Sequence, residues 1–289
     1  MKDSQIKVSI VIPAKNEAKN LNKWLPRLAE WNGYNELIII DDGSDDNTAK
    51  VAKSYGAKVL RNPQSLGNGA SIKRGFRETK GEVVVFMDAD GQHKPEDIPK
   101  LLETLESESV DMVVGARDAG GQASKARYLA NVFYNRFASY VTGQEIKDLT
   151  SGFRVVKADK FREFIYLLPN KFSYPTTSTM AFLRAGYLVR YVSVNVLRRE
   201  GRSHISPLRD GVRFLLIIFK IATLFSPLKV FLPFAALSFL LGLGRYIYTY
   251  LEMGVFTNMS ALLMVSAVQI FLIGLISEQI TALIYKKDN

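Results

Sequence analysis

Short apolar runs alternate with helix-like segments over residues 8 to about 194 of this chain of 289 residues. Residues 8–12, 37–40 and 83–87 are three such runs, and none contains a charged side chain. Uninterrupted apolar runs are typical of strands buried on both faces, and strands separated by helices form parallel sheets. The pattern predicts a Rossmann-like α/β domain, a mostly parallel sheet with helices on both faces. Such sheets bind ligands at the carboxyl ends of their strands.

Two aspartates follow the third run directly, in the stretch Asp88-Ala89-Asp90-Gly91-Gln92-His93. Carboxylates one residue apart at the end of a buried strand offer hard oxygen ligands, which suit Mg²⁺ or Mn²⁺ holding a diphosphate. An isolated Asp-x-Asp is more often a solvated turn, so this interpretation depends on motifs elsewhere in the chain.

Polar residues also follow the first two runs. These stretches are Pro13-Ala14-Lys15-Asn16-Glu17 and Asp41-Asp42-Gly43-Ser44. Both end neighbouring strands, so we expect them side by side at one edge of the sheet. Their carboxylates are suited to accept hydrogen bonds from ribose hydroxyls and a base N–H. The same residue types also cap helices, so a purely structural role stays open.

The composition narrows the classes of ligand and partner. A formal charge of +10 predicts an anionic partner: nucleic acid, anionic lipid or a phosphorylated substrate. The absence of cysteine excludes disulfides and thiolate metal sites, and two histidines are too few for a zinc site. Neither a P-loop nor a dinucleotide fingerprint occurs. No nucleic-acid partner is expected, because the basic residues gather beside the C-terminal apolar segments rather than along an aromatic-lined groove.

Two long apolar segments occupy the C-terminal part, at about residues 230–251 and 260–285. Each exceeds the ~20 apolar residues that span a ~30 Å hydrocarbon core, so two transmembrane helices are expected rather than buried helices of a soluble protein. Lys and Arg precede the first segment and follow the second, but the connecting residues 252–259 have none. The positive-inside rule then predicts a two-span membrane protein whose N-terminal domain and both termini are cytoplasmic.

Residues 208–226 are apolar but interrupted by charges, which favours a helix in the membrane interface over a third transmembrane helix. The predicted organisation is therefore a domain over residues 1–205, an amphipathic interface helix over 206–229 and a membrane anchor over 230–289.

Six motifs in order resemble glycosyltransferase family 2, which has the GT-A fold. They are Pro13-Ala14-x-Asn16-Glu17, Asp41-Asp42-Gly43-Ser44, Asp88-Ala89-Asp90-Gly91-Gln92-His93, Gly115-Ala116-Arg117, Asp148-Leu149-Thr150-Ser151-Gly152-Phe153-Arg154 and Arg198-x-x-Gly201-x-Ser203. Within the family they are similar to the dolichyl-phosphate mannose synthase branch, whose bacterial relatives load sugars onto undecaprenyl phosphate. The resemblance covers about residues 6–205, and the interface helix and two spans are also similar.

The resemblance implies an inverting, metal-dependent enzyme of the polyprenyl-phosphate glycosyltransferase type. It would transfer a hexose from a nucleotide-sugar, UDP-glucose or similar or GDP-mannose, to a polyprenyl phosphate in the bilayer. The chemistry agrees with this expectation, because a phosphate monoester with a second pKa of about 6 is largely dianionic at neutral pH. Such a nucleophile needs no general base.

Roles for individual residues follow from the resemblance. The expected catalytic residues are Asp90, Arg117 and Arg127. The metal ligands are expected to be Asp88, Asp90 and Gln92, holding Mg²⁺ or Mn²⁺. The donor nucleotide would contact Pro13, Ala14, Asn16, Glu17, Asp41, Asp42, Asp88 and Arg198. The acceptor phosphate would contact Arg117, Arg127, Asn131 and Ser203.

Two departures from the family pattern stand out. His204 replaces the usual Lys after Ser203, which would make any phosphate contact there depend on pH near neutrality. Gly91 stands where mannose synthases often carry Leu, which favours a UDP-sugar.

Two other functions were weighed. A processive membrane polysaccharide synthase usually carries Gln-x-x-Arg-Trp, but the only tryptophans here are Trp24 and Trp31. A non-catalytic GT-A membrane scaffold is disfavoured by the intact aspartates and arginines. The sequence leaves open the sugar, the nucleotide, the choice between dolichyl and undecaprenyl acceptors, and the oligomeric state, a homo-oligomer included.

Overall fold

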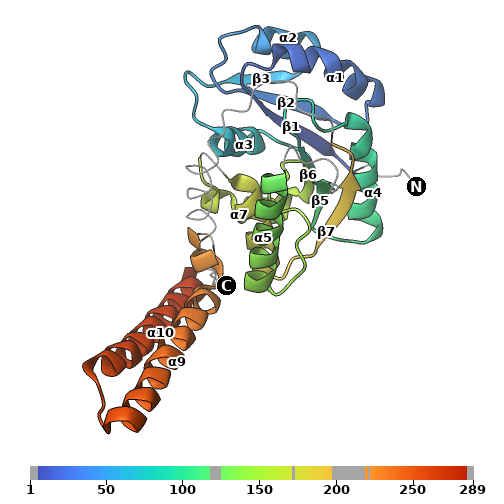
Figure 1. Ribbon diagram of the computed structural model, residues 1–289. Coiled ribbons are helices and arrows are strands. Elements are labelled where there is room, and N and C mark those ends of the chain that lie inside the picture. The colour runs from blue at the N-terminus through green and yellow to red at the C-terminus, as the bar shows by residue number, and fades with distance from the viewer. Residues whose placement is uncertain (1–5, 118–124, 171–172, 197–218, 221, 285–289) are drawn as a thin grey trace. The chain divides into compact units, whose positions relative to one another are not determined.

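The computed structural model describes residues 6–117, 125–170, 173–196, 219–220 and 222–284, with no description of the side chains of 125–130 and 284 (Figure 1). The chain forms two compact units. Unit 1 comprises residues 1–137 with 144–204, and unit 2 comprises 138–143 with 205–289. Most of the predicted interface helix, residues 206–218 and 221, lies outside the described residues. The predicted domain boundaries stay a prediction.

Unit 1 is built on a seven-stranded sheet in the order β3-β2-β1-β4-β6-β5-β7. The strands are β1 Val8–Ala14, β2 Glu36–Asp41, β3 Lys58–Arg61, β4 Val83–Phe86, β5 Met112–Arg117, β6 Arg154–Lys157 and β7 Val189–Val194. All neighbouring pairs are parallel except those made by β6, which runs antiparallel to β4 and β5. The predicted mostly parallel α/β sheet is therefore confirmed, and the inserted antiparallel strand was not anticipated.

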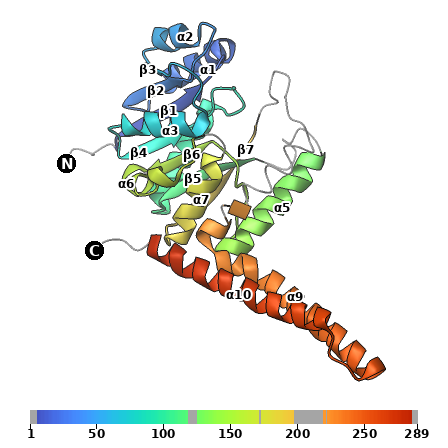
Figure 2. The same cartoon turned by 90° about the vertical axis from the view of Figure 1, so that its left-hand side faces the viewer.

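Helices cover both faces of this sheet (Figure 2). They are α1 Ala18–Trp31, α2 Thr48–Ser54, α3 Asn68–Arg77, α4 Ile98–Ser107, α6 Ala158–Arg162 and α7 Tyr174–Arg184, with short 3-10 turns at Pro95–Asp97 and Ile165–Leu167. A further helix, α5 Lys125–Thr142, begins in unit 1 and ends in unit 2. On one face, the apolar stripes of α1 and α4 join alternate residues of the strands in a single buried core. Successive side chains of a strand point to opposite faces, so the remaining strand residues form the core of the second face.

The second face is organised around the ring of Phe86 on β4, which is fully buried. This ring lies 6.4 Å from Phe76 of α3, 4.8 Å from Phe161 of α6 and 6.1 Å from Tyr174 of α7, measured between centroids. Aromatic pairs at these separations add to the stabilisation from buried area. One side chain at the end of β4 thus ties three helices to the sheet immediately before Asp88.

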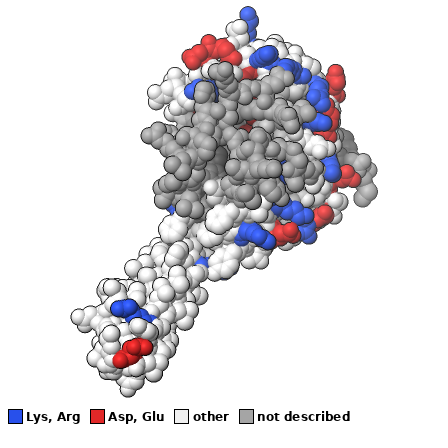
Figure 3. Space-filling model, in the orientation of Figure 1, with Lys and Arg blue, Asp and Glu red and all other residues white. Residues whose placement is uncertain are grey.

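Unit 2 is dominated by a hairpin of two helices, α9 Pro227–Met253 and α10 Asn258–Ile284. Both are long and apolar enough to cross a membrane. Figure 3 shows few charged side chains on their surface. The Ser238 hydroxyl donates to the Leu263 carbonyl across the pair at 2.9 Å. The two predicted apolar helices are therefore present, and their topology in a membrane stays a prediction.

A glycine allows α3 to approach the sheet. A Cβ atom on Gly75 would lie 2.5 Å from both Ile40 Cδ1 and Val11 Cγ1. We expect Gly75→Ala to lower the free energy of unfolding by about 1–3 kcal/mol through overpacking, although alanine favours an open helix position. Urea denaturation followed by circular dichroism measures the change. In an Ile40→Val background one of the two clashing atoms is gone, so the loss should be smaller. An equal loss in both backgrounds would contradict this account.

Candidate active site at the carboxyl edge of the sheet

The loops that follow β1 and β2 lie side by side, as expected. The strands pair in parallel up to Ala14 and Asp41. Beyond them, the Asn16 N–H donates to the Ser44 hydroxyl at 2.9 Å, and the Asp45 N–H donates to the Asn16 side-chain oxygen at 2.8 Å. Asn16 adopts a left-handed backbone with φ of 55°, which asparagine tolerates better than most residues. These hydrogen bonds hold the two loops against each other.

The carboxylates of the loop that follows β2 accept hydrogen bonds from other residues of the protein. Asp42 is buried and accepts four hydrogen bonds, from Asn62 Nδ2 at 2.6 Å, Ser65 Oγ at 2.8 Å and the N–H groups of Leu66 and Gly67 at 2.8 and 2.9 Å. A carboxylate has about four acceptor positions. Burial alone raises the pKa of Asp42, but these hydrogen bonds hold the net pKa below its usual range. Asp42 therefore organises the loop that leads into α3.

The Asp41 carboxylate also makes contacts within the protein. Its Oδ1 atom accepts from the Ser44 N–H at 2.8 Å, and its Oδ2 atom lies 3.4 Å from Arg61 Nε. Only 1% of the residue is exposed. Direct contact of Asp41 or Asp42 with a nucleotide stays a prediction, and the structure adds a structural role for both.

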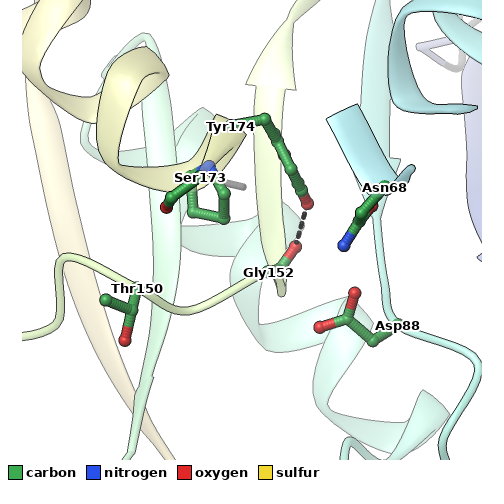
Figure 4. A pocket seen from close by; sticks show the side chains of 7 residues that line it. Asn68, Asp88, Thr150, Gly152, Ser173 and Tyr174 are labelled. Atoms are coloured by element: carbon green, nitrogen blue, oxygen red, sulfur yellow. Dashed lines mark hydrogen bonds between the residues drawn. The ribbon is translucent and has the colours of Figure 1, made fainter. Parts of the chain in front are cut away.

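A small hollow, partly open to solvent, lies beside Asp88. Figure 4 shows the side chain of Asn68 directed toward the Asp88 carboxylate. The residues that line the hollow are Asn68, Asp88, Thr150, Gly152, Ser173, Tyr174 and Pro175. Asn68 is the first residue of α3, so the loop held by Asp42 also fixes this contact to Asp88.

The charge of Asp88 is poorly compensated. Desolvation of its carboxylate, followed by the charge of Asp90, raises the pKa of Asp88 to about 6, although Asn68 and two arginines act in the opposite direction. A divalent cation relieves such an arrangement, because its charge offsets both carboxylates. In the part of the chain that the structure describes, no group of three or more His, Cys, Asp or Glu forms a metal cluster. Two carboxylates still fit Mg²⁺, which usually keeps several waters and binds substrate phosphates as well.

Only a glycine fits at the position opposite the Asp88 side chain. A Cβ atom on Gly152 would collide with the Asp88 carboxylate, its Cγ at 2.9 Å. The Gly152 carbonyl accepts a hydrogen bond from the Tyr174 hydroxyl at 2.9 Å (Figure 4). The preceding Ser151 donates to the Gly115 carbonyl at 2.6 Å. The motif around Gly152 thus forms a wall of the hollow without filling it.

Arg117, which is expected to bind the acceptor phosphate, makes a bidentate ion pair. Its Nε and Nη2 atoms lie 2.7 and 2.9 Å from the two oxygens of Asp148, and Nη2 also donates to the Thr150 hydroxyl. About a quarter of the Arg117 side chain is exposed, against 8% for Asp148. This geometry fixes the plane of the guanidinium. Sequence reasoning included Asp148 in a motif but did not give it this role.

Arg154 is a second arginine close to the hollow, and no role was predicted for it from the sequence. It is fully buried and donates to the carbonyl of Pro175 at 3.0 Å and to the hydroxyls of Ser178 and Thr179 at 2.7 and 3.2 Å. It also donates to the Ser151 carbonyl. Burial lowers the pKa of Arg154, and no ion pair to it occurs among the described residues. Its hydrogen bonds join α7 to the motif that lines the hollow.

The remaining predicted site residues are only partly placed. Pro13 and Ala14 end β1, Glu17 precedes α1, and Asn131 lies on α5. Gln92 follows Asp90, and its N–H donates to Asp90 Oδ1 at 3.1 Å. Arg198, Ser203 and His204 lie outside the described residues, as does the side chain of Arg127.

The ion pair between Arg117 and Asp148 predicts a pH-dependent contribution to stability. Burial alone would raise the pKa of Asp148. The hydrogen bonds and positive charge of Arg117 lower it by more than burial raises it, so the net pKa lies below its usual range. We expect Asp148→Asn to cost about 2 kcal/mol of unfolding free energy at neutral pH. Because the pKa of Asp148 is lower in the folded than in the unfolded protein, the difference in unfolding free energy between wild type and variant is full above about pH 4. It shrinks as the pH falls through the pKa that Asp148 has in the folded protein.

Urea denaturation of both proteins from pH 3 to 7 measures the effect of Asp148→Asn. The matched control is Asp159→Asn, because Asp159 makes a pair with Lys160 at 3.2 Å but its side chain is 68% exposed. An exposed pair of this kind contributes little. A difference for Asp148→Asn that grows as the pH falls would contradict the assignment.

Comparisons with known proteins identify the family and the fold. The model of "Glycosyl transferase family 2" matches residues 9–165, and that of the "GtrB C-terminal hairpin" matches residues 226–283. In solved structures, glucosyl-3-phosphoglycerate synthase from Mycobacterium tuberculosis, in complex with Mn²⁺ and UDP-glucose, has a similar fold. The TM-score is 0.60 at 21% identity, over 75% of this chain and 79% of that one.

Several curated relatives are named for lipid phosphates. A dolichol-phosphate mannosyltransferase from Pyrococcus furiosus is 39% identical over 122 residues, which is 40% of this chain but only 34% of that protein. An undecaprenyl-phosphate mannosyltransferase from Micrococcus luteus is 29% identical, over 70% of this chain and 88% of the relative. Glycosyltransferase AglJ from Haloferax volcanii is 26% identical, over 96% and 94%. The predicted resemblance to this branch is confirmed, and the chain belongs to glycosyl transferase family 2, a family of enzymes.

Proposed function

We propose that this protein transfers a hexose from a nucleotide-sugar to a polyprenyl phosphate held in a membrane. The observation that carries the proposal is the Asp88 carboxylate, poorly compensated in charge and exposed to a hollow at the carboxyl edge of the sheet. The names of the relatives from Pyrococcus furiosus and Micrococcus luteus support the lipid phosphate as acceptor. The match to a C-terminal hairpin model supports a membrane location.

Asp88, Asp90 and Gln92 would hold Mg²⁺ or Mn²⁺, since the residues present fit a hard divalent cation. When bound, such an ion neutralises the negative charge that develops on a nucleoside diphosphate leaving group. The structural neighbour from Mycobacterium tuberculosis, solved with Mn²⁺ and UDP-glucose, supports both a divalent ion and a nucleotide-sugar.

The donor would lie across the edge of the sheet. Pro13, Ala14, Asn16, Glu17, Asp41 and Asp42 would surround the nucleoside, with Arg198 as a further contact. The sugar would occupy the hollow beside Asp88, where the side chains of Asn68 and Thr150 offer hydrogen-bonding groups to its hydroxyls. Groups of this kind orient a polar ligand in a pocket.

The acceptor phosphate would bind Arg117 and Arg127, with Asn131 and Ser203 assisting. Asp148 fixes the Arg117 guanidinium before the lipid arrives, so less conformational freedom is lost on binding. The phosphate oxygen attacks the anomeric carbon directly, and its bond forms as the bond to the nucleoside diphosphate breaks. A single displacement inverts the anomeric centre, so an α-linked donor gives a β-linked lipid product.

The hairpin α9–α10 would anchor the protein in the bilayer with both termini in the cytoplasm. A polyprenyl phosphate keeps its tail in lipid and its phosphate at the surface, so an anchored enzyme meets its acceptor there. The interface helix predicted over 206–229 would bring basic residues to the anionic surface.

Removal of Asp90 tests catalysis against a scaffold role. We expect Asp90→Ala to lower the transfer rate at least about a hundredfold, because the developing charge loses its stabilisation. Transfer of a labelled sugar to a polyprenyl phosphate measures the rate, and chelation by EDTA should abolish the wild-type activity until Mn²⁺ or Mg²⁺ is added. The matched control is Asp45→Ala, an exposed aspartate at the same edge of the sheet. Full activity of a folded Asp90→Ala variant would contradict the proposal.

Nucleotide binding identifies the donor. With Mn²⁺ present, the correct nucleoside diphosphate at about 100 times its Kd should stabilise the folded protein by roughly 2.7 kcal/mol, seen as a rise in Tm. UDP and GDP, each with and without Mn²⁺, are the arms of the experiment, and a UDP-hexose is the expected donor. Stabilisation by neither nucleotide would contradict a nucleotide-sugar donor.

A further inference from the structure

The middle of α10 carries a polar side chain on its outer surface. Gln269 lies two residues from the midpoint of Asn258–Ile284, about 3 Å along the helix axis. Its side chain is exposed, and within the described residues nothing hydrogen-bonds its amide. If the hairpin spans a bilayer, as the proposed function requires, this amide lies near the centre of the hydrocarbon.

The amide points away from the other helix of the hairpin. On α10, the residues that face α9 recur every seventh position and are all buried: Ser260, Ala267, Gly274 and Thr281. The close approach is direct, since a Cβ atom on Gly274 would lie 2.8 Å from Phe231 Cβ of α9. Gln269 follows Ala267 by two residues, which is about 200° around the helix. The contacts between α9 and α10 therefore leave Gln269 without a partner.

Hydrocarbon offers no hydrogen bond to such a group. An amide transferred from water to an apolar medium without a partner is strongly disfavoured. In membrane helices, glutamine side chains instead hydrogen-bond across to another helix. The position of Gln269 thus indicates a further helix against this face of α10.

A second copy of the same helix satisfies the amide best. The side chain carries both a donor NH₂ group and an acceptor carbonyl, so it is complementary to itself. A two-fold axis places the same residue of each copy opposite the other, and each amide then donates to its partner's carbonyl. A charged ligand would instead call for a side chain of opposite charge, and Gln269 has no charge to offer.

The residues around Gln269 provide a continuous seam for this contact. Leu262, Val265, Gln269, Leu272 and Ile276 are spaced alternately by three and four residues, and all five are exposed. This is the spacing of a helix–helix seam, in which a single polar residue fixes the register. We propose that two copies of this protein pair through α10 along this stripe, with their Gln269 amides hydrogen-bonded to each other near the membrane centre.

Single-cysteine variants test the contact, because the natural chain contains no cysteine. Full-length Ile276→Cys protein, purified and reconstituted in vesicles, carries the cysteine on the same stripe and keeps the Gln269 amide, so it should form a disulfide-linked dimer on oxidation. The matched control is Leu275→Cys, whose position is also exposed, at 38%, and lies at nearly the same depth but about 100° around the helix. Since disulfides need closely placed Cβ atoms, we expect at least about fivefold more dimer from Ile276→Cys on a non-reducing gel. Equal cross-linking of the two variants would overturn the proposal.

Removal of the amide tests its contribution. Gln269→Leu keeps an apolar side chain of similar size, and we expect the dimer to dissociate about tenfold more readily in detergent, measured by energy transfer between labelled copies. Val268→Leu should leave association unchanged. A monomeric wild-type protein, or an Ile276→Cys protein that in native membranes cross-links only to a different protein, would overturn the proposal.

Failure of this inference and failure of the proposed function give different results. Sugar transfer by the wild-type protein reports on the function, and cross-linking reports on the contact between helices. An inactive protein that still cross-links through position 276 would contradict the function alone. An active protein that remains monomeric would contradict the inference alone.

Discussion

Two aspartate carboxylates at the end of one buried strand impose an electrostatic constraint on unit 1. Desolvation and mutual repulsion raise the pKa of Asp88 to about 6, so the folded protein holds charge that its own side chains compensate only in part. The strand is held rigidly, because Phe86 ties three helices to its end. The rigid strand and the poorly compensated Asp88 carboxylate support the proposal that a cation, and the phosphates that a cation binds, lie here.

The surroundings of this pair are arranged by hydrogen bonds from distant segments. Asp42 holds the loop before α3 and through it places Asn68 against Asp88. Arg154 joins α7 to the segment that contains Gly152, and Gly152 leaves room for the Asp88 carboxylate. Each of these residues acts on the site through another part of the chain.

The hairpin, which we propose spans a membrane, would follow a different physical rule. In unit 1, apolar burial from water drives assembly, but helices in hydrocarbon gain little from apolar contact with each other. Small residues therefore line the contact between α9 and α10, with Gly242 and Gly274 at points of closest approach. In such surroundings a polar side chain carries more information than an apolar one. This is why Gln269 is more informative than the many exposed leucines around it.

Much of the fold was predictable from local pattern. Apolar runs of four or five residues marked β1, β2 and β4, and the aspartates that follow β2 and β4 marked the edge of the sheet at which we propose that ligands bind. The lengths of the two apolar segments predicted α9 and α10. These features depend on the period and length of hydrophobic runs, which neighbouring residues determine. The identity of six short motifs in order was enough to indicate the family.

Tertiary structure alone decided how the polar side chains are used. The pairing of Arg117 with Asp148 joins residues 31 positions apart, and the contacts of Asp42 reach 20 to 25 positions along the chain. The antiparallel insertion of β6 between β4 and β5, which brings Gly152 to Asp88, likewise joins distant segments. A carboxylate or guanidinium can bind many partners equally well, so its sequence neighbours do not select one. The selection is made when folding brings particular groups within hydrogen-bonding distance and removes the water that would compete for them.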